Sequence, residues 1–374
     1  MSTEVFVVGS SWRNVPEDTD LQLDELVFEA VSEALRSAGI TRHQVGISVI
    51  SSLDLYDGRS ISNALTAPAA AGYLGDELRV EGDVMAATYV ALAALVANQV
   101  DVAVVTGLHV PEIATSEERR LAGFREQVSN YTFDAHLDRP VGMSSQVTLG
   151  MHAASRLQSG QADLSEMAAR AAADISRGST RRGVRSAASA ADVASAPTVV
   201  TPLTELMLPA ASTGVGVLVL AADVVARRSL PPITRIAGWG MATAPRSSSP
   251  GWLDDPAAAT RRAAEQAYAL AGITNAAEQI DIVEMTDLTP ALSPELLAAL
   301  AFADTKPERV NPSGGVRANF PGIANGALRL IEATEAASRD GGRNGEKRRS
   351  VAHSMDDLSG LVTSTATVFV LEEV

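Results

Sequence analysis

The sequence predicts an α/β protein made of two similar halves, with a helical segment inserted into the first half. Apolar β-branched stretches alternate with helical stretches along the chain, which is the pattern of a sheet covered by helices. The helix ends SAGIT (37–41) and LAGIT (270–274) are each followed by a short linker and a strand, VGISVISS and IDIVEMTD respectively. This repeat indicates a duplicated α/β unit.

The stretch 80–107, VEGDVMAATYVALAALVANQVDVAVVTG, is expected at the centre of the first half. Met85 to Ala97 is apolar almost all round and rich in Ala, which is typical of a helix enclosed on every side. Val100 to Val105 is rich in β-branched residues and predicts a strand covered on both faces. The order is therefore a short extended segment, a buried helix and a buried strand.

The rest of the first half supplies the other strands of this unit. Strands are expected at Glu4–Gly9, Val45–Ser51 and Val215–Leu220, with helices at Leu21–Ala38 and Ala221–Arg228 and a loop with a short helix at 57–71. Gly39 directly after the first helix is a typical stop signal.

Residues 108–197 carry no strand pattern. Helices are expected at Ser145–Ser159 and Leu164–Ile175, followed by a tract rich in Arg, Ser and Ala from 177 to 196. A connection of this length is usually a functional lid or loop domain. We therefore expect an N-terminal half over residues 1–228, with a loop domain at about 108–197, and a C-terminal half over 229–374.

The second half repeats the order of the first. It is expected to contain a strand at Ile233–Gly240, a helix at Pro294–Ala303, a Gly-rich turn at Asn311–Gly315, a helix at Gly322–Ala337 and a strand at Thr365–Leu371.

Composition limits the function. The 374 residues are 46% hydrophobic, enough for a large core, and carry a net charge of −15, which disfavours nucleic acid and anionic membrane as partners. The apolar runs stop short of the roughly 20 residues that a membrane span needs, so we expect a cytoplasmic protein. The chain has no cysteine, which excludes disulfides, thiolate metal sites and a cysteine nucleophile.

Three motifs resemble those of the thiolase superfamily, in particular its sterol-carrier and lipid-transfer branch. They are VEGDVMAATYVAL (80–92), IVEMTDLTPALSPELLAAL (282–300) and VNPSGGVRANFPGIANGALRLIEA (310–333). The resemblance covers nearly the whole chain. It implies two α-β-α-β-α halves with a helical loop domain that covers an acyl-CoA.

The resemblance also implies that the catalytic groups of thiolases are replaced. The nucleophilic cysteine corresponds to Met85, or to Val84 if the alignment moves by one residue, and the catalytic histidine corresponds to Phe320. Thr286 stands at the loop position that orients a water or oxyanion. A second cysteine would fall between His353 and Gly360. A thioether cannot be deprotonated or acylated, so thiolase activity is not expected.

Several polar residues remain open between structural and functional roles. Asp287 is expected to cap the following helix, and Asp287, His353 and Asp356 are the alternative bases for another chemistry. Ligand contacts are expected from four residues of the Gly-rich turn, where simple turn chemistry is an equal explanation: Asn311, Ser313, Gly314 and Gly315. Asp134, His136 and Asp138 alternate in a polar loop that lacks a fourth ligand, so no metal is expected.

Three functions follow from this reading. The first is a structural or regulatory subunit, in a homodimer or beside an active thiolase-like acyltransferase in acyl-CoA or polyketide-type metabolism, with residues 79–82 near the interface. The alternative is a retro-aldolase on β-hydroxyacyl-CoA with an OB-fold and zinc-ribbon partner. The third is an acyl-CoA binding module. CoA or acyl-CoA is the expected ligand, and its phosphates would need a basic rim. The available basic residues are Arg181, Arg182, Arg185, Arg317 and the cluster at 343–349, which is expected to be a solvated loop.

Overall fold

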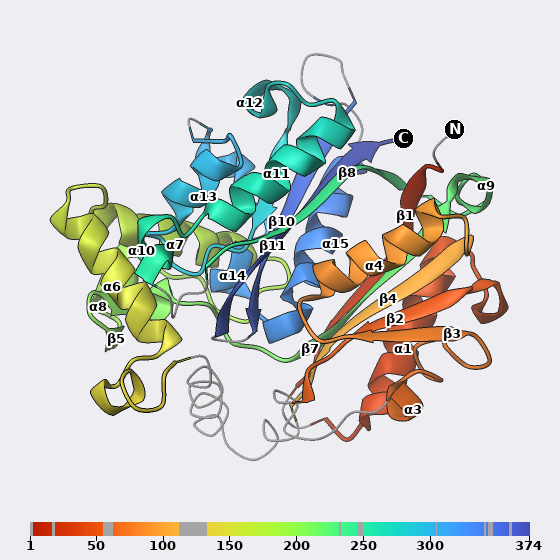
Figure 1. Cartoon of the computed structure of the whole chain (residues 1–374), viewed down its shortest axis with the longest axis horizontal. Helices are drawn as coiled ribbons and strands as arrows, with labels where there is room; N and C mark the ends of the chain where they lie inside the picture. Colours follow the sequence, from red (N-terminus) through yellow and green to blue (C-terminus); the bar gives the residue numbers. More distant parts are fainter. Residues whose placement is uncertain are drawn as a thin grey trace.

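The computed structural model describes residues 3–16, 19–54, 63–111, 133–231, 233–245, 250–303, 305–339, 342, 347–358 and 361–374. A nine-stranded mixed sheet runs through the molecule, in the strand order β3-β2-β4-β7-β1-β8-β11-β10-β9 (Figure 1). The predicted α/β class is therefore confirmed.

The order of the strands repeats from the middle of the sheet outward. The first half contributes β1 (Val5–Asn14), β7 (Gly214–Ala222), β4 (Val102–His109), β2 (Ile47–Ser51) and β3 (Asp76–Val80). The second half contributes β8 (Thr234–Thr243), β11 (Leu361–Glu373), β10 (Arg349–Leu358) and β9 (Ile282–Met285) in the corresponding places. The halves meet where β1 pairs antiparallel with β8, through Phe6 with Arg235 and Val7 with Thr234.

The repeated helices α1 (Leu23–Ala38) and α11 (Ala258–Ala271) pack on equivalent strands. Helix α1 contacts β1 and β7, and α11 contacts β8 and β11. Each ends at a glycine in the left-handed region, Gly39 with φ of 69° and Gly272 with φ of 67°. A residue with a β-carbon is strained at such a position, which explains the shared AGIT pattern.

Two helices lie at the centre, α4 (Val84–Val96) and α15 (Asn325–Ala337). They share one apolar core with both halves of the sheet, in which Leu92 of α4 and Ile331 of α15 are fully buried. Of the residues of α4, only Ala93 is exposed. The helix predicted from the 80–107 stretch is thus enclosed as expected, because its side chains offer no polar face to water.

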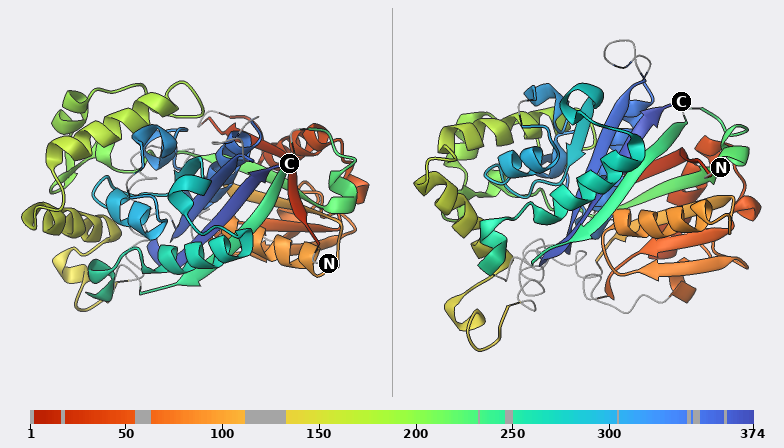
Figure 2. Two further views of the ribbon diagram at one scale, coloured as in Figure 1. Left: turned by 90° about the horizontal axis from the view of Figure 1, so that it is seen from above. Right: turned by 45° about the horizontal axis from the view of Figure 1, so that its top comes forward.

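The segment expected to form the loop domain, at about 108–197, contains η4 (Arg139–Val141), α6 (Ser145–Gln158), α7 (Leu164–Gly178) and α8 (Ala190–Ser195) among its described residues. The small hairpin of β5 (Thr198–Val200) and β6 (Leu203–Thr204) follows it. These helices lie to one side of the C-terminal half in every view (Figures 1 and 2). Residues 133–197 contain helices and turns and no strand, as predicted. Helix α7 shares its apolar core with that half.

The remaining elements are short and connect these units: α3 (Asn63–Thr66), α9 (Asp223–Ala226), α10 (Pro250–Asp254), α12 (Ala276–Gln279), α13 (Ser293–Ala299), α14 (Gly315–Ala318) and the single turns η1 (Arg42–Gln44), η5 (Glu205–Met207), η6 (Pro307–Arg309) and η7 (Gly322–Ala324). The helix expected at 221–228 is shorter than predicted because β7 continues to Ala222. Strand β10 was not predicted at all. Among the described residues, no helix combines the length and hydropathy of a membrane span.

Candidate functional site

The first turns of the two central helices meet at the side chain of Asp83. Its Oδ1 accepts the N–H of Met85 at 2.8 Å, and its Oδ2 accepts the N–H of Gly326 at 3.1 Å. A β-carbon at Gly326 would lie 2.1 Å from Asp83 Oδ1 and 2.7 Å from Met85 Cγ. One carboxylate therefore caps the positive ends of α4 and α15 together, and only glycine fits at the contact.

Met85 fills the space at this junction. Its side chain is fully buried and belongs to the central apolar core. The thioether is a polarisable apolar group that packs well in such a place and has no proton to lose. This position, predicted to replace the thiolase cysteine, is occupied by a packing residue.

Thr286 follows β9 and joins three elements. Its Oγ1 donates to the carbonyl of His353 in β10 at 3.3 Å and accepts the Nδ2–H of Asn325 at 2.7 Å. Its own N–H donates to the same carbonyl of His353 at 3.2 Å. Thr286 thus contacts Asn325 at the start of α15, and the next residue, Gly326, lies against Asp83 and Met85. The hydrogen bonds of Thr286 hold the end of β9 in place.

Phe320 packs against the loop domain. Its N–H donates to the carbonyl of Ala210 at 2.7 Å, its carbonyl accepts from Ser212 at 3.2 Å, and its ring is buried in the core that contains α7. Two residues later Gly322 has φ of 50°, and a β-carbon there would fall 2.7 Å from the ring of His109.

His109 was not identified from the sequence. It is the last residue of β4 and is fully buried. The sequence signal that could identify His109 is a polar ring at the end of a mostly apolar strand, because strand ends are common places for functional side chains. Among the histidines described, it is the one whose ring lies against the turn that carries Phe320.

Asp287 is part of a buried polar cluster. Its Oδ1 accepts Nδ2–H of Asn311 at 3.1 Å, while its Oδ2 accepts the hydroxyl of Ser293 and Nη2–H of Arg317 at 2.5 Å. Arg317 also donates through Nε to Asp174 of α7 at 2.7 Å. The expected capping role is wrong, because α13 begins after Leu292 without a side-chain cap.

Opposite charges in this cluster counteract the effect of burial on the pKa values of Arg317 and Asp174. Burial works against the charge of Arg317, but Asp174 and Asp287 hold the pKa of its guanidinium above the ordinary value. Burial raises the pKa of Asp174, and Arg317 counteracts this. A carboxylate tied to Arg317, Ser293 and Asn311 is poorly suited to accept a substrate proton.

His353 and Asp356 lie on β10. The Nε2 of His353 is 3.0 Å from Oγ1 of Thr260, and burial lowers the pKa of the ring to about 4 although Asp287 acts in the opposite direction. His353 is therefore neutral at pH 7. The side chain of Asp356 lies outside the described side chains.

The Gly-rich turn is held by polar contacts within the protein. Asn311 has φ of 46° and accepts Met285 N–H at 2.7 Å through Oδ1. Ser313 donates its N–H at 2.9 Å and its hydroxyl at 2.6 Å to Glu284. Gly314 and Gly315 have φ of 93° and 59°. Internal hydrogen bonds and backbone conformations that favour glycine thus hold this turn, and ligand contact by these four residues stays a prediction.

Glu284 itself is a fully buried carboxylate on β9. Besides Ser313 it contacts Nη1 of Arg329 in α15 at 3.1 Å. Burial raises the pKa of its carboxyl to about 7, and Arg329 opposes that rise. The pair links the second half of the sheet to the central helix.

The four arginines considered for a phosphate-binding rim are engaged inside the protein. Arg181 and Arg182 contact Glu332 of α15 at 2.8 and 2.6 Å. Arg185 donates to the carbonyls of Leu208 and Arg317 at 2.9 and 3.2 Å. With Arg317 in the buried cluster, these side chains tie the loop domain to the C-terminal half. Of the basic cluster 343–349, residues 343–346 lie outside the described residues, and Arg349 begins β10.

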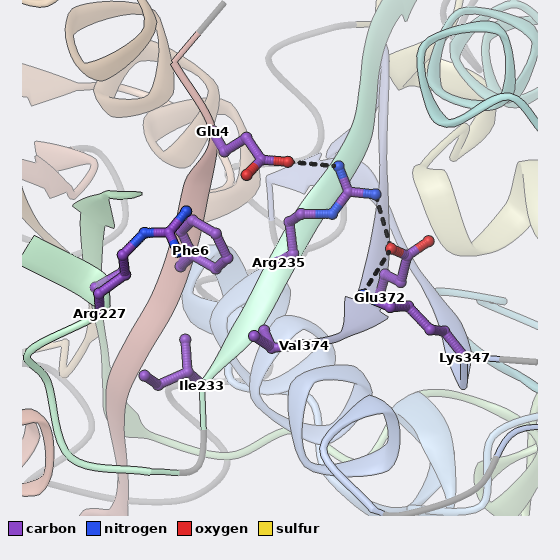
Figure 3. A pocket seen from close by; sticks show the side chains of 9 residues that line it. Glu4, Phe6, Arg227, Ile233, Arg235, Lys347, Glu372 and Val374 are labelled. Carbon is purple, nitrogen blue, oxygen red and sulfur yellow. Dashed lines mark hydrogen bonds and ion pairs between the residues drawn. The ribbon is translucent and has the colours of Figure 1, made fainter. Parts of the chain in front are cut away.

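Three of the pockets on the described surface lie near charged side chains. One of about 420 Å³ lies between α7 and the segment before α13, and Asp287 and Asn311 line it. One of about 470 Å³ lies beside Glu295 of α13. The third, of about 350 Å³, lies at the start of β1 and β8 (Figure 3).

The polar loop at 134–138, where the sequence predicts no metal site, is held by its own hydrogen bonds. There Asp134 accepts the N–H groups of His136 and Leu137, both at 2.8 Å, and these bonds lower the pKa of its carboxyl. The carboxylate therefore stabilises its own turn. Among the described residues no group of three or more potential ligands could hold a metal ion.

Solved structures share this fold over the whole chain. Human mitochondrial 3-ketoacyl-CoA thiolase matches with a TM-score of 0.75 at 14% identity, covering 99% of each chain. Its complex with CoA matches with a TM-score of 0.74 at 13% identity, covering 100% of this chain and 98% of the other. The Ltp2-ChsH2(DUF35) aldolase matches with a TM-score of 0.76 at 17% identity, covering 99% and 98%.

The fold of the chain is the thiolase fold. No protein-family model and no curated protein matches its sequence.

Proposed function

We propose that the chain is a thiolase-fold subunit that lacks the thiolase nucleophile and supports an active thiolase-like acyltransferase. The carrying observation is that a chain without cysteine has fully buried Met85 at the head of α4. Acyl transfer of the thiolase type needs a thiolate and a base to ionise it. The groups around Met85 act in helix capping and strand contacts instead.

Co-expression with a thiolase-like subunit from a neighbouring gene tests this role. Affinity purification followed by native mass spectrometry should recover a stable complex, and the partner's acyltransferase activity should fall when this chain is omitted. A chain that purifies as a stable monomer, with no partner and no effect on such an enzyme, would sink the proposal.

An acyl-CoA is the ligand that we propose for the site. The support is the thiolase fold, since one of the matched structures is a thiolase in complex with CoA. Calorimetry with free CoA and with acyl-CoA tests it. Because the loop-domain arginines already pair with carboxylates and carbonyls, we expect the acyl chain to contribute most of the affinity, with much weaker binding of free CoA.

A retro-aldolase is the second candidate. The similarity in fold to the Ltp2-ChsH2(DUF35) aldolase favours it. Such a reaction needs a base and no cysteine. Since Asp287 is tied into its cluster and the pKa of His353, lowered to about 4 by burial, makes its ring a weak base, His109 beside Gly322 is the base that we favour.

Cleavage of a β-hydroxyacyl-CoA, with and without an OB-fold and zinc-ribbon partner, separates the two functions. For the aldolase, His109→Ala should lose turnover, and Asp287→Asn and His353→Ala should retain it in folded protein. This result would support the aldolase with His109 as its base. Absence of turnover in the assembled complex would leave the supporting-subunit role.

A further inference from the structure

The 350 Å³ pocket lies at the opposite end of the strands from the site described above. Strand β4 ends at His109 level with Gly214, whereas Val5 at the start of β1 is level with Ala222 at the other end of β7. The eight residues of β4 span about 25 Å. The pocket is therefore separate from the Met85 region and independent of the function proposed there.

Cations from separate segments gather around one buried carboxylate in this pocket. Glu372 accepts Nη2–H of Arg235 at 2.7 Å and Nε–H of Arg349 at 2.8 Å, and Nζ of Lys347 is 4.0 Å away. The second Nη of Arg235 reaches Glu4 at 3.2 Å (Figure 3). Three cations thus share two carboxylates.

The surplus positive charge is accessible. The Lys347 side chain is 57% exposed, and the Arg227 side chain, which pairs with Asp223 at 3.0 Å, is 74% exposed; both line the pocket. With Arg227 and Asp223 included, four cations face three side-chain carboxylates, which leaves one positive charge in excess. In Figure 3 they lie on opposite sides of Arg235. Although burial works against it, hydrogen bonds from Arg235 and Arg349 keep the pKa of Glu372 below its ordinary value, so its charge holds both guanidinium groups in place.

The positive charge of this pocket contrasts with the negative net charge of the whole chain. The chain carries a net charge of −15, yet Arg227, Arg235 and Lys347, from three separate segments, line this one pocket. The apolar side chains of Phe6 and Ile233 form part of the wall. A guanidinium held by two carboxylates, with an exposed cation on either side of it, suits a multiply charged oxyanion.

We propose that this pocket binds the phosphate group of a small phosphorylated molecule, with Lys347 and Arg227 as its direct contacts and the apolar part of the ligand against Phe6 and Ile233. A phosphate carries two negative charges near pH 7 and can be met from both sides of the pocket, whereas a single carboxylate would engage one cation.

Calorimetric titration with phenyl phosphate tests the site on the full chain, with inorganic phosphate, benzoate and phenol as comparison probes. Phenyl phosphate should bind more tightly than inorganic phosphate, and benzoate and phenol should bind more weakly than either. Lys347→Gln and Arg227→Gln should each weaken phenyl phosphate binding about tenfold, as expected for the loss of one charge-assisted contact.

Arg261→Gln is the matched control, since Arg261 is also an exposed arginine that pairs with a nearby aspartate, Asp255, and lies in a different pocket. It should leave the affinity unchanged. Equal weakening in all three variants, or no heat of binding in the unmodified protein, would overturn the proposal. Because both contacts are surface side chains, circular dichroism of each variant separates loss of binding from loss of fold.

Discussion

At the scale of single residues, the junction of α4 and α15 decides what the site can do. Asp83 places a carboxylate at the N-terminus of α4, where its Oδ1 accepts the N–H of Met85. In a cysteine enzyme the same helix end would favour a thiolate. Here a negative charge already occupies the position, so the helix dipole is not available to stabilise a second one.

Met85→Cys should therefore not restore thiolysis. The new thiol would be buried in an apolar core next to the Asp83 carboxylate, and both effects raise a thiol pKa. Phe320 also supplies no base. Steady-state cleavage of acetoacetyl-CoA by Met85→Cys should stay at background, and cleavage above it would contradict this account of the site. Alkylation rates against pH report the thiol pKa directly.

Glu284 should make stability depend on pH. Its pKa rises from 4.5 to about 7 on burial, so the folded state binds more protons than the unfolded state between these values. Stability should therefore fall as pH rises through this window, by up to about 3 kcal/mol, and level off above it. Urea unfolding of Glu284→Gln should lose this component of the slope.

Glu77→Gln, at an exposed position of β3, is the control for this measurement and should keep the slope of the unmodified protein. The absolute stability of Glu284→Gln is not the readout, because Arg329 loses its charged partner in that variant. An unchanged slope in Glu284→Gln would show that another group carries the titration.

The sequence identifies motif positions better than side-chain partners. Met85, Thr286 and Phe320 are singled out by local motifs, because each lies in a run with a recognisable pattern, and their correspondence to thiolase positions stays a prediction. The partners of Asp287 could not, since Arg317 and Asp174 come from distant segments that only the tertiary fold brings together. For the same reason the pairing of the loop-domain arginines was not foreseen.

At the scale of elements, Arg317 fastens the loop domain to the C-terminal half. It lies on α14 and binds Asp174 of α7 and Asp287 after β9, all fully buried. Gly178 strengthens the contact, since a β-carbon there would lie 2.1 Å from the β-carbon of Ala318. Packing and charge thus act on the same interface.

Arg317→Ala should cost about 3–5 kcal/mol because it leaves the buried carboxylate of Asp287 without a cation and that of Asp174 with Arg177 alone. Urea unfolding measures the loss, and limited trypsin cleavage at 177–185 should become faster as α7 loosens. Arg261→Ala breaks an ion pair whose side chains are 49% and 44% exposed and should cost less than about 1 kcal/mol. Equal costs would contradict the role of Arg317.

Strand β10 shows where element prediction from sequence fails. Its sequence, RSVAHSMDDL, lacks a continuous apolar pattern, although Ser350, His353 and Ser354 are all buried. Ser350 donates to the carbonyl of Ala333, and Nε2 of His353 meets Oγ1 of Thr260, so these two polar atoms have partners inside the fold. A pattern based on apolar periodicity cannot identify a strand whose buried side chains are polar.

At the scale of the whole molecule, the repeated strand order leaves the two edges of the sheet unlike. Strand β9 forms a further bridge between Val283 and Val310, which covers part of its edge. Strand β3 pairs with β2 on one side, and Leu78 on it is exposed. A strand edge that pairs with no other described strand and carries an exposed apolar side chain favours association through that edge.

Val80→Asp and Leu78→Asp test whether β3 forms the subunit interface. We expect the unmodified chain to elute as a dimer or larger complex, with an apolar interface above about 2,000 Å². Val80 also packs against the central core, so its replacement by Asp should lower the melting temperature as well as cause dissociation. Leu78 is 44% exposed, so Leu78→Asp should dissociate the complex and leave the fold intact.

Leu270→Asp, on the exposed face of α11, is the control and should change neither the elution volume nor the melting temperature. An unchanged elution volume for both β3 variants would place the interface elsewhere, because an unpaired charge buried between subunits costs several kcal/mol.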